Sequence, residues 1–235
     1  MGTWGPGILQ NDAAYDGLGD AIREMEGVVP ALSGSAEEVP RLLACLGALV
    51  QCSRFSFKEG NAFRPLAAAA VKRHRPHLGQ VPPEVASFLD AIEGEKEPTY
   101  TPVGVPAQLV DALNGTDAGF AKTWARPPKG CFDHPLAKSM LQEFADRRVA
   151  NIDADFRDED IVGDLCRESA VMGEFALLLL LEPILIDPAR FERWRDLWRE
   201  GREEPHPDEA EFYTEYDACL EAAFSYGIAR FSSAT

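Results

Sequence analysis

Positive charge is scarce in this sequence. Lys and Arg number 23 against 39 Asp and Glu, which gives a formal net charge of −16 at pH 7. A charge of this size repels the phosphates of nucleic acids and anionic lipid head groups. We therefore expect neither direct nucleic-acid binding nor membrane binding. The same charge would speed encounter with a basic protein, and acidity that serves solubility alone is the alternative explanation.

Long apolar runs and an apparent signal peptide are missing as well. The longest apolar run, residues 175–181, is bounded by Glu174 and Glu182 and is far shorter than the roughly 20 residues that cross a bilayer. The first ten residues contain neither a basic segment nor an apolar core. The five cysteines are odd in number and widely spread, which favours reduced, buried thiols over a disulfide framework. We expect a cytoplasmic location.

The familiar catalytic signatures are absent too. The sequence contains no phosphate-cradling glycine loop, no dinucleotide fingerprint, no nucleophile elbow and no His-Glu-x-x-His zinc helix. We expect no cofactor, and the absences argue against an enzyme. They leave open a catalytic site assembled from scattered residues, which a single sequence does not reveal.

What the sequence does have is apolar residues at helical spacing. Val39, Leu42, Leu43, Leu46, Leu49 and Val50 form one continuous stripe. We predict a mainly α fold, an irregular multi-helix bundle with a Pro/Gly-rich middle segment. Helices are expected over 12–26, from Pro40 onward, and over 61–73, 83–93, 106–113, 136–149, 159–182, 188–201 and 208–229.

Prolines and glycines punctuate the chain between Pro82 and Pro128. We predict a single helical domain over residues 1–235 with a hinge or subdomain joint within 94–130. Convincing pairs of alternating strands are not apparent, although residues 99–105 could form a short extended piece.

A first acidic segment follows residue 152. Its clustered carboxylates suggest a binding site for a hard divalent cation. The pattern of a calcium-binding loop is not met, because Arg157 stands where an oxygen ligand is needed and Asp158 replaces the glycine of the sharp turn. We therefore predict no metal and interpret the segment as a solvated helix N-terminus that a partner could contact. The candidate partner-binding residues here are Asp153, Asp155, Asp158, Glu159 and Asp160.

A second acidic segment runs from Glu200 to Glu221. Acids interleaved with exposed aromatic rings can mimic a nucleic-acid strand or dock on a basic protein surface. The alternative is that rings such as Tyr216 face the core while the acids face water, as helical spacing allows. The candidate partner-binding residues here are Glu209, Glu211, Tyr213 and Glu215.

Two groups with histidines are weaker candidates. His74 and His77 lie among Lys and Arg without a third ligand at a recognisable spacing, so we expect surface residues. Cys131, Asp133 and His134 bring a thiol, a carboxylate and an imidazole together, but a catalytic Cys/His pair usually comes from distant segments.

The N-terminus carries a specific motif, Gly-Thr-Trp-Gly-Pro-Gly followed by Asn-Asp. Residues 1–16 resemble the opening of the bacterial family known as domain of unknown function 4259. The resemblance implies a small bacterial, cytoplasmic protein and supplies no catalytic residues. Physically the segment resembles a structural anchor, with a buried ring, glycines that let the backbone follow it and a helix cap. The anchor residues are Trp4, Gly5, Gly7, Asn11 and Asp12.

The leading hypothesis is a non-enzymatic binding protein, such as an immunity-type or antitoxin-like inhibitor of a basic partner. The rival is an enzyme or small-ligand receptor with a pocket between the two helical halves, using Asp133, His134 or the carboxylates of 153–160. A third hypothesis is a subunit of a homo-oligomer, which exposed Trp194 or Trp198 would indicate. The sequence leaves the oligomeric state open.

Overall fold

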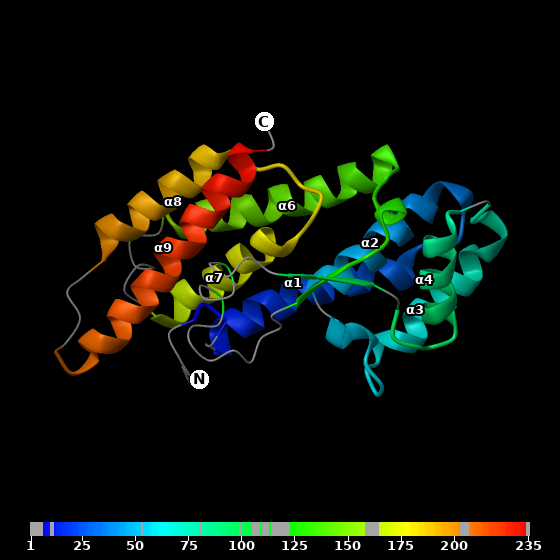
Figure 1. Ribbon diagram of the computed structural model, residues 1–235, viewed down its shortest axis with the longest axis horizontal. Helices are drawn as coiled ribbons and strands as arrows, with labels where there is room; N and C mark the ends of the chain where they lie inside the picture. The colour runs from blue at the N-terminus through cyan, green and yellow to red at the C-terminus, as the bar shows by residue number, and fades with distance from the viewer. Residues whose placement is uncertain are drawn as a thin grey trace.

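A computed structural model describes residues 7–9, 12–52, 54–79, 81–98, 100–104, 109, 113, 123–157, 165–202 and 207–233. In these ranges the chain forms eight α-helices packed into a bundle, which confirms the predicted mainly α, irregular multi-helix fold (Figure 1). The helices are α1 (Asp12–Ala31), α2 (Val39–Cys52), α3 (Phe63–His74), α4 (Pro83–Glu93), α6 (Pro135–Asp155), α7 (Leu165–Leu180), α8 (Pro188–Gly201) and α9 (Ala210–Ser232).

The bundle is elongated, and α1 runs through its centre (Figure 1). The hairpin of α8 and α9 lies at one end with α6 and α7 beside it, and α3 and α4 lie at the other end. The described helices pack around one connected apolar core, to which α2 contributes its whole predicted stripe, with Leu42, Leu46 and Leu49 fully buried. The apolar run 175–181, too short to cross a bilayer, is buried in this core.

Aromatic rings join the α8–α9 hairpin to α7. The Phe175 ring lies 5.0 Å from that of Phe224, and the Phe191 ring lies 5.1 Å from that of Trp194. Trp194 is fully buried and Trp198 is nearly so. The exposed tryptophan that would have indicated a homo-oligomer is therefore not found at either position.

A glycine permits a close approach of α1 and α7. A Cβ atom placed on Gly173 of α7 would lie 2.9 Å from the carbonyl carbon of Ala14 and 3.0 Å from the amide nitrogen of Leu18, and nearer still to the Ala14 carbonyl oxygen. Real Cβ atoms do not approach backbone this closely. The two backbones of α1 and α7 can meet here because residue 173 has no side chain.

Arginines from other helices satisfy the carbonyls at two helix ends. Arg73 of α3 donates to the carbonyl oxygens of Leu32 and Pro30, at the end of α1. Arg230 of α9 donates to the carbonyl oxygens of Leu178, Leu179 and Leu181, at 3.2, 2.6 and 2.6 Å. The last carbonyls of a helix have no partner within the helix, so these contacts fix both helix ends to neighbouring elements.

Several predicted boundaries need correction. Helix α6 extends to Asp155 instead of ending at 149, and α7 is described from Leu165 instead of 159. Residues Thr101–Gly104 (β1) pair antiparallel with Thr123–Arg126 (β2), so a strand pair exists where none was convincing from sequence. The extended piece predicted at 99–105 contains β1, whereas most of the helix predicted at 106–113 lies outside the described residues. None of the helices in the described ranges is both long and apolar enough to span a membrane.

Candidate protein-interaction surface

The two acidic segments have different structural environments. Asp153 is only 8% exposed, and its carboxylate accepts from the Trp194 indole N–H at 2.8 Å and pairs with Arg190. These contacts tie the end of α6 to α8. Asp153 therefore stabilises the interior and offers no free carboxylate to a partner.

The first acidic segment was also expected to be a helix N-terminus. The structure places Asp153 and Asp155 in the last turn of α6, where the helix dipole is negative and disfavours carboxylates. That interpretation is wrong for these two residues, and the cation Arg190 compensates at Asp153. Asp158, Glu159 and Asp160 lie outside the described residues.

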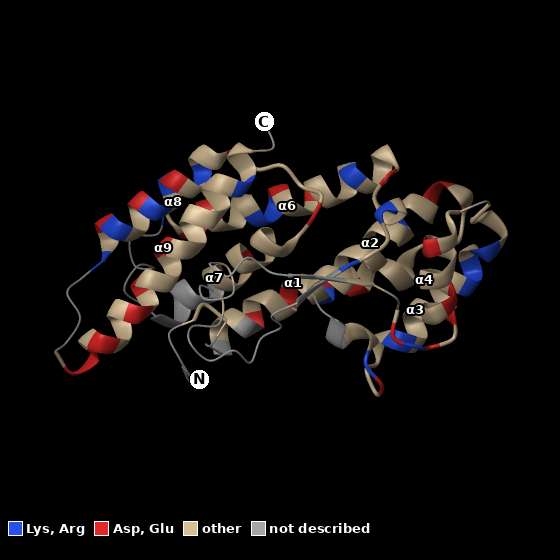
Figure 2. Cartoon of the chain, in the orientation of Figure 1, with Lys and Arg blue, Asp and Glu red and all other residues tan. Residues whose placement is uncertain are grey.

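The second acidic segment lies at the start of α9. Glu209 is the residue before the helix, and Glu211 and Glu215 follow in its first turns. All three side chains are exposed, and none has an ion pair or hydrogen bond with another residue in the ranges that the structure describes. We call these three residues the acidic face. Figure 2 shows acidic residues gathered at this end of α9.

Acids further along α9 are neutralised. Asp217 accepts from Arg202 at 2.7 Å, and Glu221 accepts from Arg199 through both of its oxygens, at 2.5 and 2.7 Å. The two arginines come from the end of α8 and the residue after it. The first turns of α9 thus keep their negative charge, while the following turns use theirs to bind α8.

The aromatic residues of α9 divide between core and surface. Tyr216 is buried, as the alternative interpretation of this segment predicted, whereas Phe212 and Tyr213 are half-buried. The Phe212 ring stacks on Tyr216 at 6.1 Å and meets Tyr213 edge-on at 5.5 Å. Tyr213 therefore keeps part of its ring at the surface, on the side of α9 opposite Glu211 and Glu215.

Arg202 lies against this aromatic group. Its guanidinium carbon is 4.7 Å from the Tyr213 ring centroid, 5.8 Å from that of Tyr216 and 5.9 Å from that of Trp198. Burial raises the pKa of Asp217, and the charge and hydrogen bond of Arg202 oppose that shift. Sequence reasoning missed Arg202 as a member of this surface, although its i, i+4 spacing from Trp198 was a usable signal.

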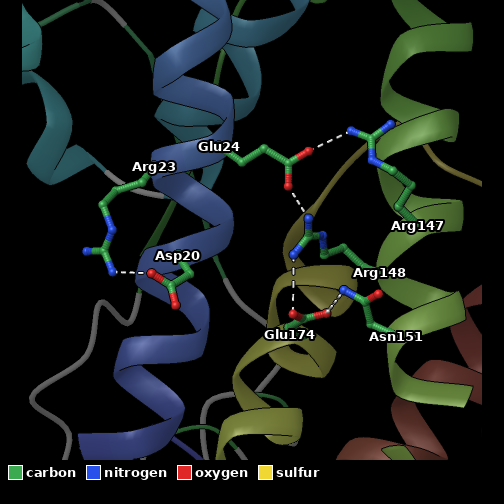
Figure 3. A network of polar contacts seen from close by, with 7 residues as sticks. All are labelled: Asp20, Arg23, Glu24, Arg147, Arg148, Asn151 and Glu174. Atoms are coloured by element: carbon green, nitrogen blue, oxygen red, sulfur yellow. Dashed lines mark hydrogen bonds and ion pairs between the residues drawn. The ribbon is translucent and has the colours of Figure 1, made fainter. Parts of the chain in front are cut away.

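A second polar cluster joins α1, α6 and α7 (Figure 3). Glu24 pairs with Arg147 at 2.7 Å and also with Arg148, and Arg148 contacts Glu174 at 3.2 Å. Burial raises the pKa of Glu174, while Arg148 and Asn151 partly offset the effect. These ion pairs hold the three helices together, while the Nε of Arg148 is buried without a hydrogen-bond partner.

The other candidates found in the sequence show no reactive arrangement. His134 begins α6, where its Nδ1 accepts from the Leu136 amide at 3.1 Å, and burial raises the pKa of Cys131 to about 12. A thiol that stays protonated is a poor nucleophile. No group of three or more His, Cys, Asp or Glu side chains within the described ranges is placed to hold a metal ion.

His74 was expected at the surface and is in fact fully buried. Its Nδ1 lies 2.8 Å from the Ala70 carbonyl oxygen, one turn earlier in α3, and its Nε2 lies 3.9 Å from a Glu38 oxygen. A local bond and a nearby carboxylate allow this ring to enter the core. His77 is exposed, as predicted.

A shallow apolar depression with no room for a water molecule is lined by Val50, Phe57, Glu97, Pro98 and Tyr100. Pockets for small ligands usually measure about 300–1,000 Å³. The depression includes neither Asp133 nor His134, so it gives no support to the pocket that the rival hypothesis invoked.

Most of the predicted anchor residues lie outside the part of the chain that the structure describes. Trp4, Gly5 and Asn11 lie outside the described residues, as does the side chain of Asp12, which is the first residue of α1. Gly7 is buried. Cys45, Cys52, Cys131 and Cys219 are free thiols, and the first three are buried as predicted.

Fold and surface together define a helical bundle that presents an acidic, partly aromatic face at the start of α9. Comparison with protein-family models, with curated proteins and with solved structures gives no match. The N-terminal resemblance to domain of unknown function 4259 stays a prediction.

Proposed function

We propose that this chain is a non-enzymatic protein-binding module whose acidic face docks on a basic protein. The observation that carries the proposal is the contrast along α9. Glu209, Glu211 and Glu215 are exposed and unpaired within the described structure, whereas Asp217 and Glu221 are bound by arginines of the same hairpin. Unpaired carboxylates on one rigid helix provide a fixed negative surface at no internal cost in broken ion pairs.

The net charge of −16 supports the same proposal because it favours encounter with a cationic protein over most of the molecular surface. The half-buried Tyr213, four positions after Glu209, adds apolar contact area, and tyrosine is enriched at protein interfaces. An immunity-type or antitoxin-like inhibitor of a basic, nucleic-acid-acting protein would use a surface of this kind. Asp153 is not part of the proposed surface.

The test is affinity capture from a bacterial lysate with the immobilised chain, followed by identification of the retained proteins. A triple variant, Glu209→Gln, Glu211→Gln and Glu215→Gln, removes the acidic face. A matched variant, Glu37→Gln, Glu84→Gln and Glu95→Gln, removes three exposed acids from the other end of the bundle and leaves the same net charge.

We expect a basic protein to be retained at about 50 mM salt and released at about 500 mM, by the wild type and by the matched variant. The acidic-face variant should bind that protein about 10- to 100-fold more weakly, since each rim charge contributes up to about 1 kcal/mol. If both variants bound the basic protein equally weakly, net charge alone would explain the effect and the acidic face would have no special role. Retention of no basic protein at low salt would contradict the proposal.

A further inference from the structure

The end of α8 and the start of α9 enclose a cation. Three aromatic rings, those of Trp198, Tyr213 and Tyr216, lie within 6 Å of the Arg202 guanidinium carbon, and Asp217 accepts a hydrogen bond from the same group. Aromatic faces together with a carboxylate are the groups that bind guanidinium and ammonium ions in recognition sites. We call these four residues the cation cage.

Arg202, whose side chain occupies the cage, lies outside the regular part of helix α8. Arg202 follows the last residue of α8, and its backbone is extended, with φ −74° and ψ 119°. Withdrawal of its side chain therefore requires no residue of α8 or α9 to leave its helix. Arg199 offers a contrast, because it lies within α8 and its guanidinium pairs with Glu221 of α9.

The cage opens beside the acidic face. Tyr213 is half-buried and follows Glu209 by four positions, about one helical turn, whereas Trp198 and Tyr216 are buried. The side chain of Arg202 keeps 15% of its surface exposed. A cation drawn to Glu209 would thus reach the half-buried Tyr213 before the buried rings.

We propose that the cation cage is a specificity pocket for one arginine side chain of a basic protein partner, and that Arg202 is an internal plug which the partner's arginine replaces. This inference rests on the proposed function and adds the chemistry of the partner's key residue. Arg202 shows that the cage accepts a guanidinium, because it binds one already. Arg202 also competes with the partner's arginine. The apparent affinity for the partner is therefore the affinity of the empty cage multiplied by the fraction of molecules whose cage is empty.

The test removes the plug and supplies a free guanidinium. N-acetyl-arginine amide is titrated into Arg202→Ala, and NMR follows the indole N–H of Trp198. N-acetyl-citrulline amide, which has the same shape and no charge, is the matched ligand. We expect a saturable shift with the arginine derivative alone, and binding about tenfold or more weaker in the wild type, where Arg202 occupies the cage.

Two further variants complete the test. Arg199→Ala removes an α8 arginine and an α8–α9 ion pair but leaves the plug, so it should behave as the wild type. Tyr213→Leu, combined with Arg202→Ala, removes one aromatic face and should abolish the shift. Arg202→Gln replaces Arg202→Ala if circular dichroism shows that the alanine variant is not folded.

A lack of saturation in the unplugged variant, an equal response to citrulline, or equal binding by the wild type would each overturn the cage proposal. The titration contains no protein partner. A saturable shift together with a failed lysate capture would therefore overturn the proposed function and support the cation cage. Capture of a basic protein without a saturable shift would support the proposed function and overturn the cage.

Discussion

At the scale of the residue, Arg230 shows how one side chain can hold a helix end. Its guanidinium reaches from α9 to the final carbonyls of α7. Burial lowers the pKa of Arg230, with Glu182 acting in the opposite direction. The carbonyls it binds would otherwise be partnerless at the end of an apolar, buried helix.

Arg230→Met keeps much of the apolar stem and removes every donor. We expect a loss of about 2–4 kcal/mol in the free energy of unfolding, because buried carbonyls lose charged hydrogen-bond donors. Urea denaturation measures the change. Arg193→Met, at an exposed position of α8, should alter stability by less than about 0.5 kcal/mol. Similar losses in the two variants would show that Arg230 is not a special contact.

Glu174 allows a prediction about pH. Its pKa is raised by burial above the ordinary value of 4.5, so the folded chain holds this proton more tightly than the unfolded chain does. The contribution of Glu174 to stability is therefore greatest below pH 4.5 and falls as the pH rises through the raised folded value.

Glu174→Gln cannot ionise and escapes this loss. The free energy of unfolding of the variant, relative to the wild type, should increase between pH 4.5 and pH 7, whatever constant cost the substitution carries. Denaturation curves at several pH values measure the difference. A flat or decreasing difference would mean that Arg148 favours the charged carboxylate more than burial disfavours it.

At the scale of the element, helix existence and helix length follow from different causes. The apolar period predicted most of the described helices, and α4 was predicted to the residue. The extension of α6 through Asp155 was missed because Asp153 is acidic and reads as a surface residue. Its burial depends on Arg190 and Trp194, which lie about forty positions further along the chain.

The crossing of α1 and α7 gives the prediction at this scale. Gly173→Ala would force a Cβ into the backbone of Ala14, and backbone cannot move aside as a flexible side chain can. We expect a loss of about 3 kcal/mol or more in the free energy of unfolding, at the upper end of overpacking costs. Thermal unfolding followed by circular dichroism measures it.

Gly27→Ala is the matched substitution in α1, where an added Cβ meets nothing within 4 Å. It should stabilise the protein by up to about 1 kcal/mol, because alanine is the better helix former. If both substitutions changed stability in the same direction, the contact at Gly173 would not be the cause.

At the scale of the whole molecule, the net charge of −16 acts against compaction. Ion pairs relieve it locally, as at Glu24 and Glu174, but the excess of 16 carboxylates has no counter-charge in the sequence. We expect the unfolding midpoint to rise by a few degrees between about 10 and 200 mM NaCl, because salt screens the repulsion.

The control for this effect is the acidic-face variant, which carries three fewer negative charges and should respond less to salt. A midpoint that falls on adding NaCl would show that attraction within ion pairs exceeds the general repulsion. Differential scanning calorimetry at several salt concentrations distinguishes the two outcomes.

The sequence by itself determined the helical class, the position of most helices and the burial of the apolar stripe of α2, because these depend on a local period of apolar residues. Tertiary structure decided which charges remain available. Asp153 entered the interior, and Asp217 gained Arg202, through partners that only packing brings near. Glu209, Glu211 and Glu215 stayed in water because no arginine of the described structure reaches them. The sequence gives the number and position of charged residues. Whether a charge is neutralised depends on distances between helices, which cannot be read from the sequence.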